Sequence, residues 1–495
     1  MKKNVLALSI TAALAGLGFS GGAQAITSII TGNAGGLALS ADGVGHSLVV
    51  PYYSAQGSNN TLINITNTDT ANGKAVKVRF RGASNSDDVY DFQVFLSPGD
   101  VWTANVSKGT DGRAQLTTTD KSCTKPANVN GSFVTARLDP KLAAADLANH
   151  TREGYVEIFN MADIQPNSSL ADEVFHVAGV PACKGTSWTA LDTNSASYEG
   201  LTFPTTGLMS NWIVINVADA GAWSGEATAV YAYGALGAPM NGNLVYWPQT
   251  SVAVGASNIG AFTADPLLTM QGTVAPVIAA AYYDLPDMST PYTPVATTPA
   301  LQASALSHSI ATTTVMNEYL TNSAINSTTD WTLSMPTRRY SVALDYSSTA
   351  GTRVYTALAP WAFFTSANTT VVNRQICVLG MSPLSYDQEE GTPTDPSAVV
   401  ISPSTPGAPI VFCGEANVLA VNNGGAAASG TLKATVARSN YDNAYSAGWL
   451  SISTPGATGG GLPVLGSAFV RATAPTGTFG VTWNHRTNRT VELYP

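Results

Sequence analysis

The sequence predicts a mainly β fold made of two or more antiparallel β-sandwich domains of the Ig-like kind, with minor short helices. Short stretches in which apolar and polar residues alternate recur along the chain, as half-buried strands require. Glycine and proline, at 45 and 27 of 495 residues, supply turns between short elements. The chain is 44% hydrophobic and only 11% charged, so it can bury a large core, and it is too long for one sandwich.

Residues 1–25 form the first element, and they are typical of a signal peptide. Lys2 and Lys3 precede an uncharged apolar run, and residues 23–25 read Ala-Gln-Ala, a small-x-small cleavage pattern. Cleavage between Ala25 and Ile26 would release the mature chain through Sec export. The apolar run is shorter than the roughly 20 residues of a membrane span, so we expect no transmembrane span after the signal is removed. The cell surface, outer envelope or medium is the expected location, with the periplasm as the alternative.

The net charge limits the partners. It is −9 for the whole chain and becomes more negative when the leader lysines are removed. An acidic chain repels phosphate backbones, so no nucleic-acid partner is expected. Self-association, other cell-envelope components or a polysaccharide remain compatible with this charge.

The middle third of the chain is acidic. No basic residue occurs between Lys184 and Arg338, although acidic residues do. This middle third therefore either docks against basic parts of the same chain or of a neighbouring copy, or uses its acids to hold cations.

The strongest strand signal is a hairpin around a turn at Asn72-Gly73. From Ala75 to Arg81 apolar and basic residues alternate, which places three basic side chains on one face of a strand. Like charges in a row need acids nearby, and cross-strand pairing supplies them. The basic residues are Lys77, Arg79 and Arg81, and the acids expected opposite them are Asp87, Asp88 and Asp91.

The same alternation predicts strands further along the chain, at residues 155–159, 340–346, 432–436 and 479–483. Helical patterns are few. Residues 139–150 contain a proline followed by helix formers, and residues 314–320 could form one or two helical turns. Four prolines between Leu285 and Pro299 favour an extended linker or a surface loop. We therefore place the domain boundary near residue 290, with β-sandwich regions at 26–290 and 291–495.

Four cysteines lie in the exported part, where oxidising conditions favour disulfides. Four cysteines allow three pairings. We favour the two that each close a loop within one half of the chain. These are Cys123 with Cys183 and Cys377 with Cys413. A metal site is the weaker interpretation, because no C-x-x-C or H-x-x-x-H spacing occurs.

One acidic cluster stands out in a chain with few charges. Its four carboxylates lie within nine residues, on a loop that contains a glycine: Asp387, Glu389, Glu390 and Asp395. Hard oxygen ligands of this kind suit calcium, although the EF-hand spacing is missing. A solvated acidic loop and a calcium site are both open interpretations. Calcium is the one cofactor that the sequence suggests.

No catalytic residue can be assigned from the sequence. The mature chain has no G-x-S-x-G elbow, no Walker loop, no G-x-G-x-x-G after a strand and no H-E-x-x-H. His485, at the end of a predicted strand, is interpreted as a surface or half-buried residue. A binding site could instead use an aromatic platform on loops at a sandwich end. The tryptophans that could form it are Trp188, Trp212, Trp223 and Trp247.

Two segments carry a resemblance to a known class of proteins. Residues 95–102 read FLSPGDVW, and residues 329–340 read TDWTLSMPTRRY. Both look like segments of bacterial, Gram-negative cell-surface proteins, and the chain as a whole resembles exported S-layer-like β proteins. The resemblance implies a location and a structural or adhesive role, and it supplies no catalytic residue. We therefore expect an exported, non-catalytic structural or adhesive cell-surface protein, with calcium stabilisation as one of the two open interpretations of the acidic loop. The alternative is a secreted or periplasmic carbohydrate-binding module or hydrolase.

Overall fold

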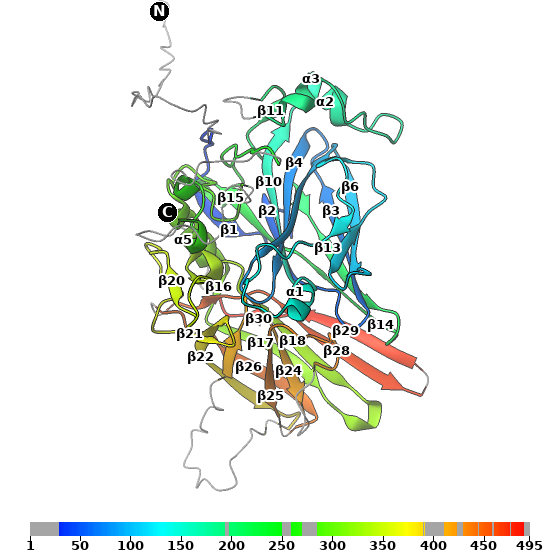
Figure 1. Cartoon of the computed structure of the whole chain (residues 1–495), viewed down its shortest axis with the longest axis vertical. Coiled ribbons are helices and arrows are strands. Elements are labelled where there is room, and N and C mark those ends of the chain that lie inside the picture. Colours follow the sequence, from blue (N-terminus) through cyan, green and yellow to red (C-terminus); the bar gives the residue numbers. More distant parts are fainter. Residues whose placement is uncertain are drawn as a thin grey trace, which may run out of the picture.

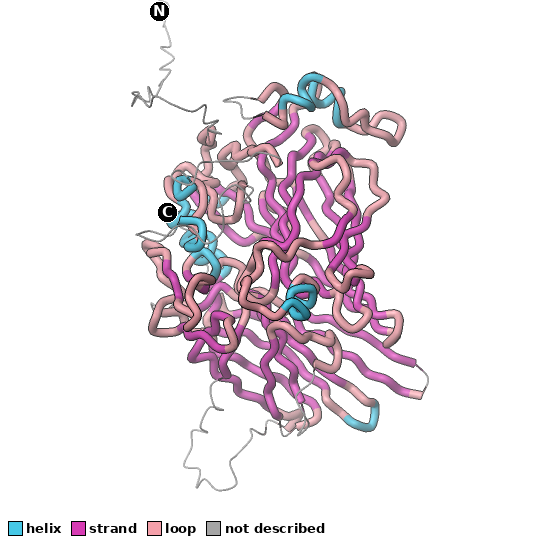
Figure 2. Tube along the Cα trace, viewed as in Figure 1, coloured by secondary structure: helices cyan, strands magenta, loops and turns pink. Residues whose placement is uncertain are grey.

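The computed structural model describes residues 29–193, 198–249, 259–269, 285–389, 391, 410–422, 429–443, 445–457, 460–475 and 477–489. Figures 1 and 2 show a chain dominated by strands, with a few short helices at its periphery. The sheets are antiparallel except for one parallel pair, β24–β25, so the predicted mainly β class is confirmed. The predicted signal peptide and its cleavage between Ala25 and Ile26 lie outside the described residues. None of the described helices is both long enough and apolar enough to cross a bilayer.

Two sheets form the N-terminal half. Sheet A runs β1-β15-β2-β10-β4-β5-β8, with β11 paired to β10, and sheet B runs β14-β13-β3-β6-β7-β9, with β12 paired to β3. They share a core, in which Phe92 of β5 packs against Trp102 of β6 with ring centroids 5.3 Å apart. The strands are β1 Gly36–Leu39, β2 Ser47–Ser54, β3 Asn59–Asn67, β4 Gly73–Gly82, β5 Asp88–Leu96, β6 Val101–Lys108, β7 Ala114–Thr117, β8 Cys123–Lys125, β9 Gly131–Ser132, β10 Glu153–Ile164, β11 Leu201–Thr202, β12 Leu208–Met209, β13 Asn211–Asn216, β14 Gly221–Glu226 and β15 Thr228–Tyr233.

Two more sheets and two strand pairs form the C-terminal half. Sheet C runs β21-β22-β26-β17-β30, with β23 paired to β22, and sheet D runs β25-β24-β18-β28-β29. The pairs are β16–β27 and β19–β20. The strands are β16 Ala311–Thr312, β17 Thr314–Leu320, β18 Thr328–Ser334, β19 Val342–Leu344, β20 Arg353–Tyr355, β21 Thr369–Val372, β22 Gln375–Tyr386, β23 Ile410–Cys413, β24 Ala416–Asn422, β25 Arg438–Asp442, β26 Ala447–Ser453, β27 Leu462–Pro463, β28 Ser467–Ala474, β29 Gly477–Asn484 and β30 Arg486–Thr487.

The two halves pack tightly although, in the described residues, no sheet contains strands from both sides of residue 290. The larger core cluster begins in sheets A and B and continues into the C-terminal half, where Phe469 packs against Trp212. Edge strands β14 and β29 lie against each other: a Cβ added at Gly480 would come 2.4 Å from the Ala222 carbonyl oxygen. Trp223 also donates from Nε1 to the Val470 carbonyl at 2.9 Å. The domain boundary near residue 290 remains a prediction.

Helices are short, and four of the sequence expectations for local structure need correction. The helices are α1 Ala144–His150, α2 Ser169–Val174, α3 Thr186–Ala190, α4 Pro266–Thr269 and α5 Pro299–Ile310, with 3-10 turns η1 Ala235–Gly237, η2 Ile259–Ala261, η4 Ser323–Ile325 and η5 Arg338–Tyr340. The helix expected at 139–150 is limited to α1. Residues 314–320 form strand β17 because Val315, Asn317 and Tyr319 alternate inward. Residues 432–436 form no strand, and 340–346 contains only the short β19.

Both expected disulfides are present. Cys123 on β8 bonds to Cys183, and Cys377 on β22 bonds to Cys413 on β23. The described residues contain no free cysteine. Each bridge therefore stabilises one half of the chain by closing a loop within it.

The basic row on β4 pairs with acids as expected, but the pairs are buried. Lys77 binds Asp91, and Nε of Arg79 lies 3.0 Å from Asp88. Arg81 instead pairs with Glu157 of β10 at 3.2 Å. The three basic side chains are each only 1% exposed. Alternation therefore identified the face that carries the charges, although that face is covered by other parts of the chain.

The segment expected as a linker or surface loop forms part of this cover. Residues 285–293 are all buried. The Pro286 carbonyl accepts a hydrogen bond from Arg79 at 2.9 Å, and the Met288 N–H donates to the Tyr340 hydroxyl at 3.2 Å. Asp287 binds Ser289 and Thr263, so polar side chains satisfy the backbone and hydroxyl groups that a buried irregular segment brings with it. The prolines therefore mark a packed irregular segment here.

Arg339 on η5 joins the two halves. Its Nε lies 3.0 Å from both carboxylate oxygens of Asp265, and its Nη1 lies 3.1 Å from Asp87 of the β4–β5 turn. The Tyr346 hydroxyl binds the same Asp87 at 2.6–2.7 Å. Burial raises the pKa of Asp87 to about 6, although Arg339 acts in the opposite direction. The neighbouring Arg338 pairs with Glu415 at 2.6 Å.

The acids of the middle third dock against basic residues of the same chain. Asp192 lies 2.6 Å from Lys125, and Asp219 lies 3.1 Å from Lys433. Asp265 is held by Arg339, as described above. These pairs support the first of the two alternatives stated for this region.

Removing the buried guanidinium should destabilise the seam between the halves. We expect Arg339→Met to lower the free energy of unfolding by about 3–5 kcal/mol, because it leaves two buried carboxylates without their partner. Urea unfolding followed by tryptophan fluorescence measures this loss. Arg113→Met, at a half-exposed pair with Asp111, is the control and should cost about 1 kcal/mol or less. Equal losses for the two variants would contradict the role given to Arg339.

His46 should make stability depend on pH. It is fully buried, and its Nδ1 accepts a hydrogen bond from the Ala232 N–H at 3.1 Å. Burial lowers its pKa from 6.5 to about 3, so the folded protein resists a proton that the unfolded chain accepts. Its contribution to stability is complete above pH 6.5 and is lost as the pH falls towards 3.

We expect His46→Asn to be less sensitive to acid than the parent protein. Below pH 6.5 the difference in unfolding free energy should change by about 1.4 kcal/mol per pH unit in favour of the variant. Urea titrations of both proteins from neutral pH down to about pH 5 measure the change. A difference that stays constant over this range would show that His46 does not carry the proton linkage.

Candidate functional site

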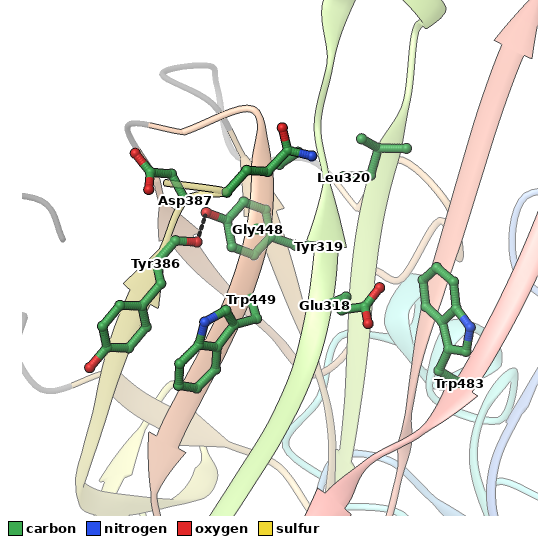
Figure 3. A pocket seen from close by; sticks show the side chains of 10 residues that line it. Glu318, Tyr319, Leu320, Tyr386, Asp387, Gly448, Trp449 and Trp483 are labelled. Carbon is green, nitrogen blue, oxygen red and sulfur yellow. Dashed lines mark hydrogen bonds between the residues drawn. The ribbon is translucent and has the colours of Figure 1, made fainter. Parts of the chain in front are cut away.

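The outer face of sheet C carries a row of side chains that crosses three strands. Tyr386 of β22 pairs in register with Trp449 of β26, and Trp449 pairs with Glu318 of β17. Residues opposite each other in neighbouring antiparallel strands project to the same face. The three side chains therefore lie side by side across the sheet, and Figure 3 shows them together.

The row lines an open groove of about 970 Å³. The rings of Tyr386 and Trp449 stack almost parallel, with centroids 4.3 Å apart and an angle of 8° between their planes. Trp483 of β29 borders the groove beyond Glu318, so the carboxylate stands between two indoles (Figure 3). Asp387 and Gln388 lie at the end of β22 and supply further polar groups.

Contacts beneath the sheet hold Glu318 in place. Trp331 of sheet D is fully buried and donates from its indole nitrogen to the Glu318 carbonyl at 3.2 Å. Asn317, pointing inward, donates to the Trp483 carbonyl at 2.9 Å. Because Asn317 precedes Glu318 in β17, this bond ties the carboxylate strand to the strand that carries the second indole. The groove is therefore built on rigid elements rather than on loops.

A glycine and a tyrosine fix the strand that carries Trp449. A Cβ added at Gly448 would lie 1.8 Å from the Tyr386 carbonyl oxygen, and its φ of 153° disfavours other residues. Tyr319 donates its hydroxyl to that same carbonyl at 2.8 Å (Figure 3), and burial raises the pKa of this phenol. The tyrosine therefore remains a neutral donor, and strands β17, β22 and β26 are locked together below the aromatic stack.

The described residues include two of the four carboxylates of the acidic cluster, Asp387 and Glu389. Asp387 uses its carboxylate to accept N–H groups of its own turn, from Glu389 at 2.9 Å and from Gly391 at 2.6 Å. Glu390 and Asp395 lie outside the described residues. Within the described ranges no three His, Cys, Asp or Glu side chains are grouped closely enough to hold a metal ion. The calcium site therefore stays a prediction, and Asp387 acts here as a turn cap and as part of the groove wall.

The four tryptophans proposed for an aromatic platform do not form one. Trp212, Trp223 and Trp247 are at most 3% exposed, because each points into the core. Trp188 is half-buried against Phe95, with the Lys125 ammonium 3.8 Å from its ring. His485 binds the Thr332 carbonyl through Nε2 at 2.9 Å, and burial lowers its pKa to about 4. It therefore serves as a neutral structural group.

Sequence reasoning missed Trp449, Trp483 and Glu318. One signal was present in the segment AGWLSIS. Leu450 and Ile452 point to the buried face of the strand, while Trp449 lies on the opposite face together with two serines. A tryptophan on the polar face of a strand is unusual. Of the described tryptophans, Trp449 is the one whose side chain is exposed, at 40%.

A second hollow, of about 770 Å³, lies on the outer face of sheet B. Leu62 and Ile213 contribute its apolar surface, and asparagine and threonine side chains surround them. It contains no aromatic or charged lining residue. The groove on sheet C is therefore the site with the more specific chemistry.

No family model, no curated protein and no solved structure matches the chain.

Proposed function

We propose that this chain is an exported, non-catalytic binding protein of the bacterial cell envelope, and that it holds a glycan in the groove on sheet C. The row Tyr386–Trp449–Glu318, continued by Trp483, carries the proposal. Pyranose rings present apolar C–H faces that stack on aromatic rings, while their hydroxyls need polar partners at the rim. The groove offers both kinds of surface.

Several features support the location and the adhesive role within this proposal. The predicted signal peptide and the two disulfides are typical of an exported protein. Facing antiparallel sheets are compatible with the Ig-like sandwiches that we include in the proposal. Self-association into an S-layer-like coat would be a further consequence of surface location. Such self-association would not involve the groove.

The binding surface is already formed in the isolated chain. Trp449 is held by paired strands on both sides and by the stack with Tyr386. Little ordering is therefore needed when a ligand binds, which lowers the entropic cost of association. This agrees better with holding a ligand than with a site that must close over a reacting bond.

Truncating the exposed indole should remove binding without unfolding the protein. We expect Trp449→Ala to weaken the affinity for a bound hexasaccharide by about tenfold or more, because a stacked ring is lost. Isothermal calorimetry with soluble hexamers of glucose, xylose, N-acetylglucosamine and glucosamine measures the loss. Phe479→Ala is the control, since this ring is 60% exposed but lies outside the groove.

Failure of all four hexamers to bind, or binding that is unchanged in Trp449→Ala, would contradict the proposal. Release of shorter sugars during the incubation would instead favour the hydrolase alternative. Circular dichroism of each variant provides the control for folding.

A further inference from the structure

The groove on sheet C carries negative charge without a compensating cation. Its lining contains the carboxylates of Glu318 and Asp387 and no lysine, arginine or histidine. In the described residues neither carboxylate forms an ion pair with a basic side chain. Every lysine, arginine and histidine after Lys3 lies in the described part of the chain. No basic residue of the mature chain is therefore left to fill this role.

The nearest basic side chain by strand register is Arg486 on β30. It pairs with Met316, which is two residues before Glu318 on the same face of β17. It is exposed to solvent and does not line the groove. Among the described residues Arg486 forms no ion pair with Glu318, so the Glu318 carboxylate is available to a ligand.

Indoles on both sides of a carboxylate form an environment that favours cations. The face of an aromatic ring carries negative potential and attracts ammonium groups, most strongly for tryptophan. A carboxylate adds a charge-assisted hydrogen bond to the same group. An anionic sugar such as a uronate would be repelled by Glu318 and by Asp387.

The row is too long for one small cation. Tyr386, Trp449 and Glu318 lie on three consecutive strands, so they span roughly 10 Å across the sheet. Trp483 extends the row beyond Glu318. This length fits successive rings of a sugar chain, with an ammonium group placed at Glu318.

We infer that the groove binds an amine-bearing polysaccharide, a polymer of glucosamine units with free ammonium groups, through stacking on Trp449 and Trp483 and an ion pair with Glu318. This inference rests on the proposed function and specifies its ligand class. It distinguishes this ligand from neutral and N-acetylated glycans of the same backbone shape.

The test compares two probes that differ only in the amine: the hexamers of glucosamine and of N-acetylglucosamine, at mildly acidic pH where the amines are protonated. We expect the glucosamine hexamer to bind the parent protein about tenfold tighter or more. Added salt should reduce this preference, because it screens a partly exposed ion pair. Glu318→Gln should remove the preference, because it weakens binding of the glucosamine hexamer far more than binding of the N-acetylated hexamer. Glu199→Gln, at an exposed carboxylate outside the groove, should preserve the preference.

The outcomes separate the two claims. If both hexamers bind equally and both are lost in Trp449→Ala, the glycan groove stands and the amine preference is overturned. If monomeric glucosamine binds as tightly as the hexamer, the site is a cage for a single cation, and the polysaccharide assignment is overturned. If neither of these two hexamers binds, the amine-bearing ligand is overturned, and the proposed function falls as well when the glucose and xylose hexamers also fail to bind. Thermal melting of each variant shows whether a loss comes from unfolding.

Discussion

The buried pairing of Arg339 with Asp87 and Asp265 determines how the two halves of this chain meet. The two acids come from the β4–β5 turn and from the segment before α4, and the arginine comes from η5. A charge buried at 1% exposure requires a partner in the right place, because an unpaired ion in the interior is strongly destabilising. This requirement favours an arrangement of the seam in which both acids reach the guanidinium.

The local part of this network could be predicted from the sequence, and the long-range part could not. Strand alternation and a short turn predict that the basic row of β4 meets the acids of β5, because hairpin neighbours are determined by nearby residues. The individual pairs run diagonally: Arg79 lies opposite Asp91 in register but binds Asp88. Arg81 binds Glu157 and Asp87 binds Arg339, which lie far away in the chain. Residues 285–293 help to bury these ion pairs. The prolines of this segment, taken alone, indicated a linker or a surface loop.

The candidate site shows the same division more sharply. The two disulfides could be predicted from cysteine spacing, since each loop closes within one half. The groove could not, because Glu318, Tyr386 and Trp449 become neighbours only through the register of β17, β22 and β26. The local sequence of residues 314–320 is compatible with one or two helical turns. The inward bonds of Asn317 and the burial of Tyr319 are tertiary effects, and they favour the strand over local preference.

The charge of the groove also bears on what can cover it. An aromatic patch exposed on an open sheet face would ordinarily attract another apolar surface, including a second copy of the same chain. Glu318 and Asp387 border this patch, and two copies meeting there would bring four carboxylates together without a basic residue from either groove. Repulsion between like charges therefore opposes self-association at this face while the indoles remain accessible. A ligand that brings both an apolar ring face and a positive charge can stack on the indoles and pair with the carboxylates of the groove at the same time.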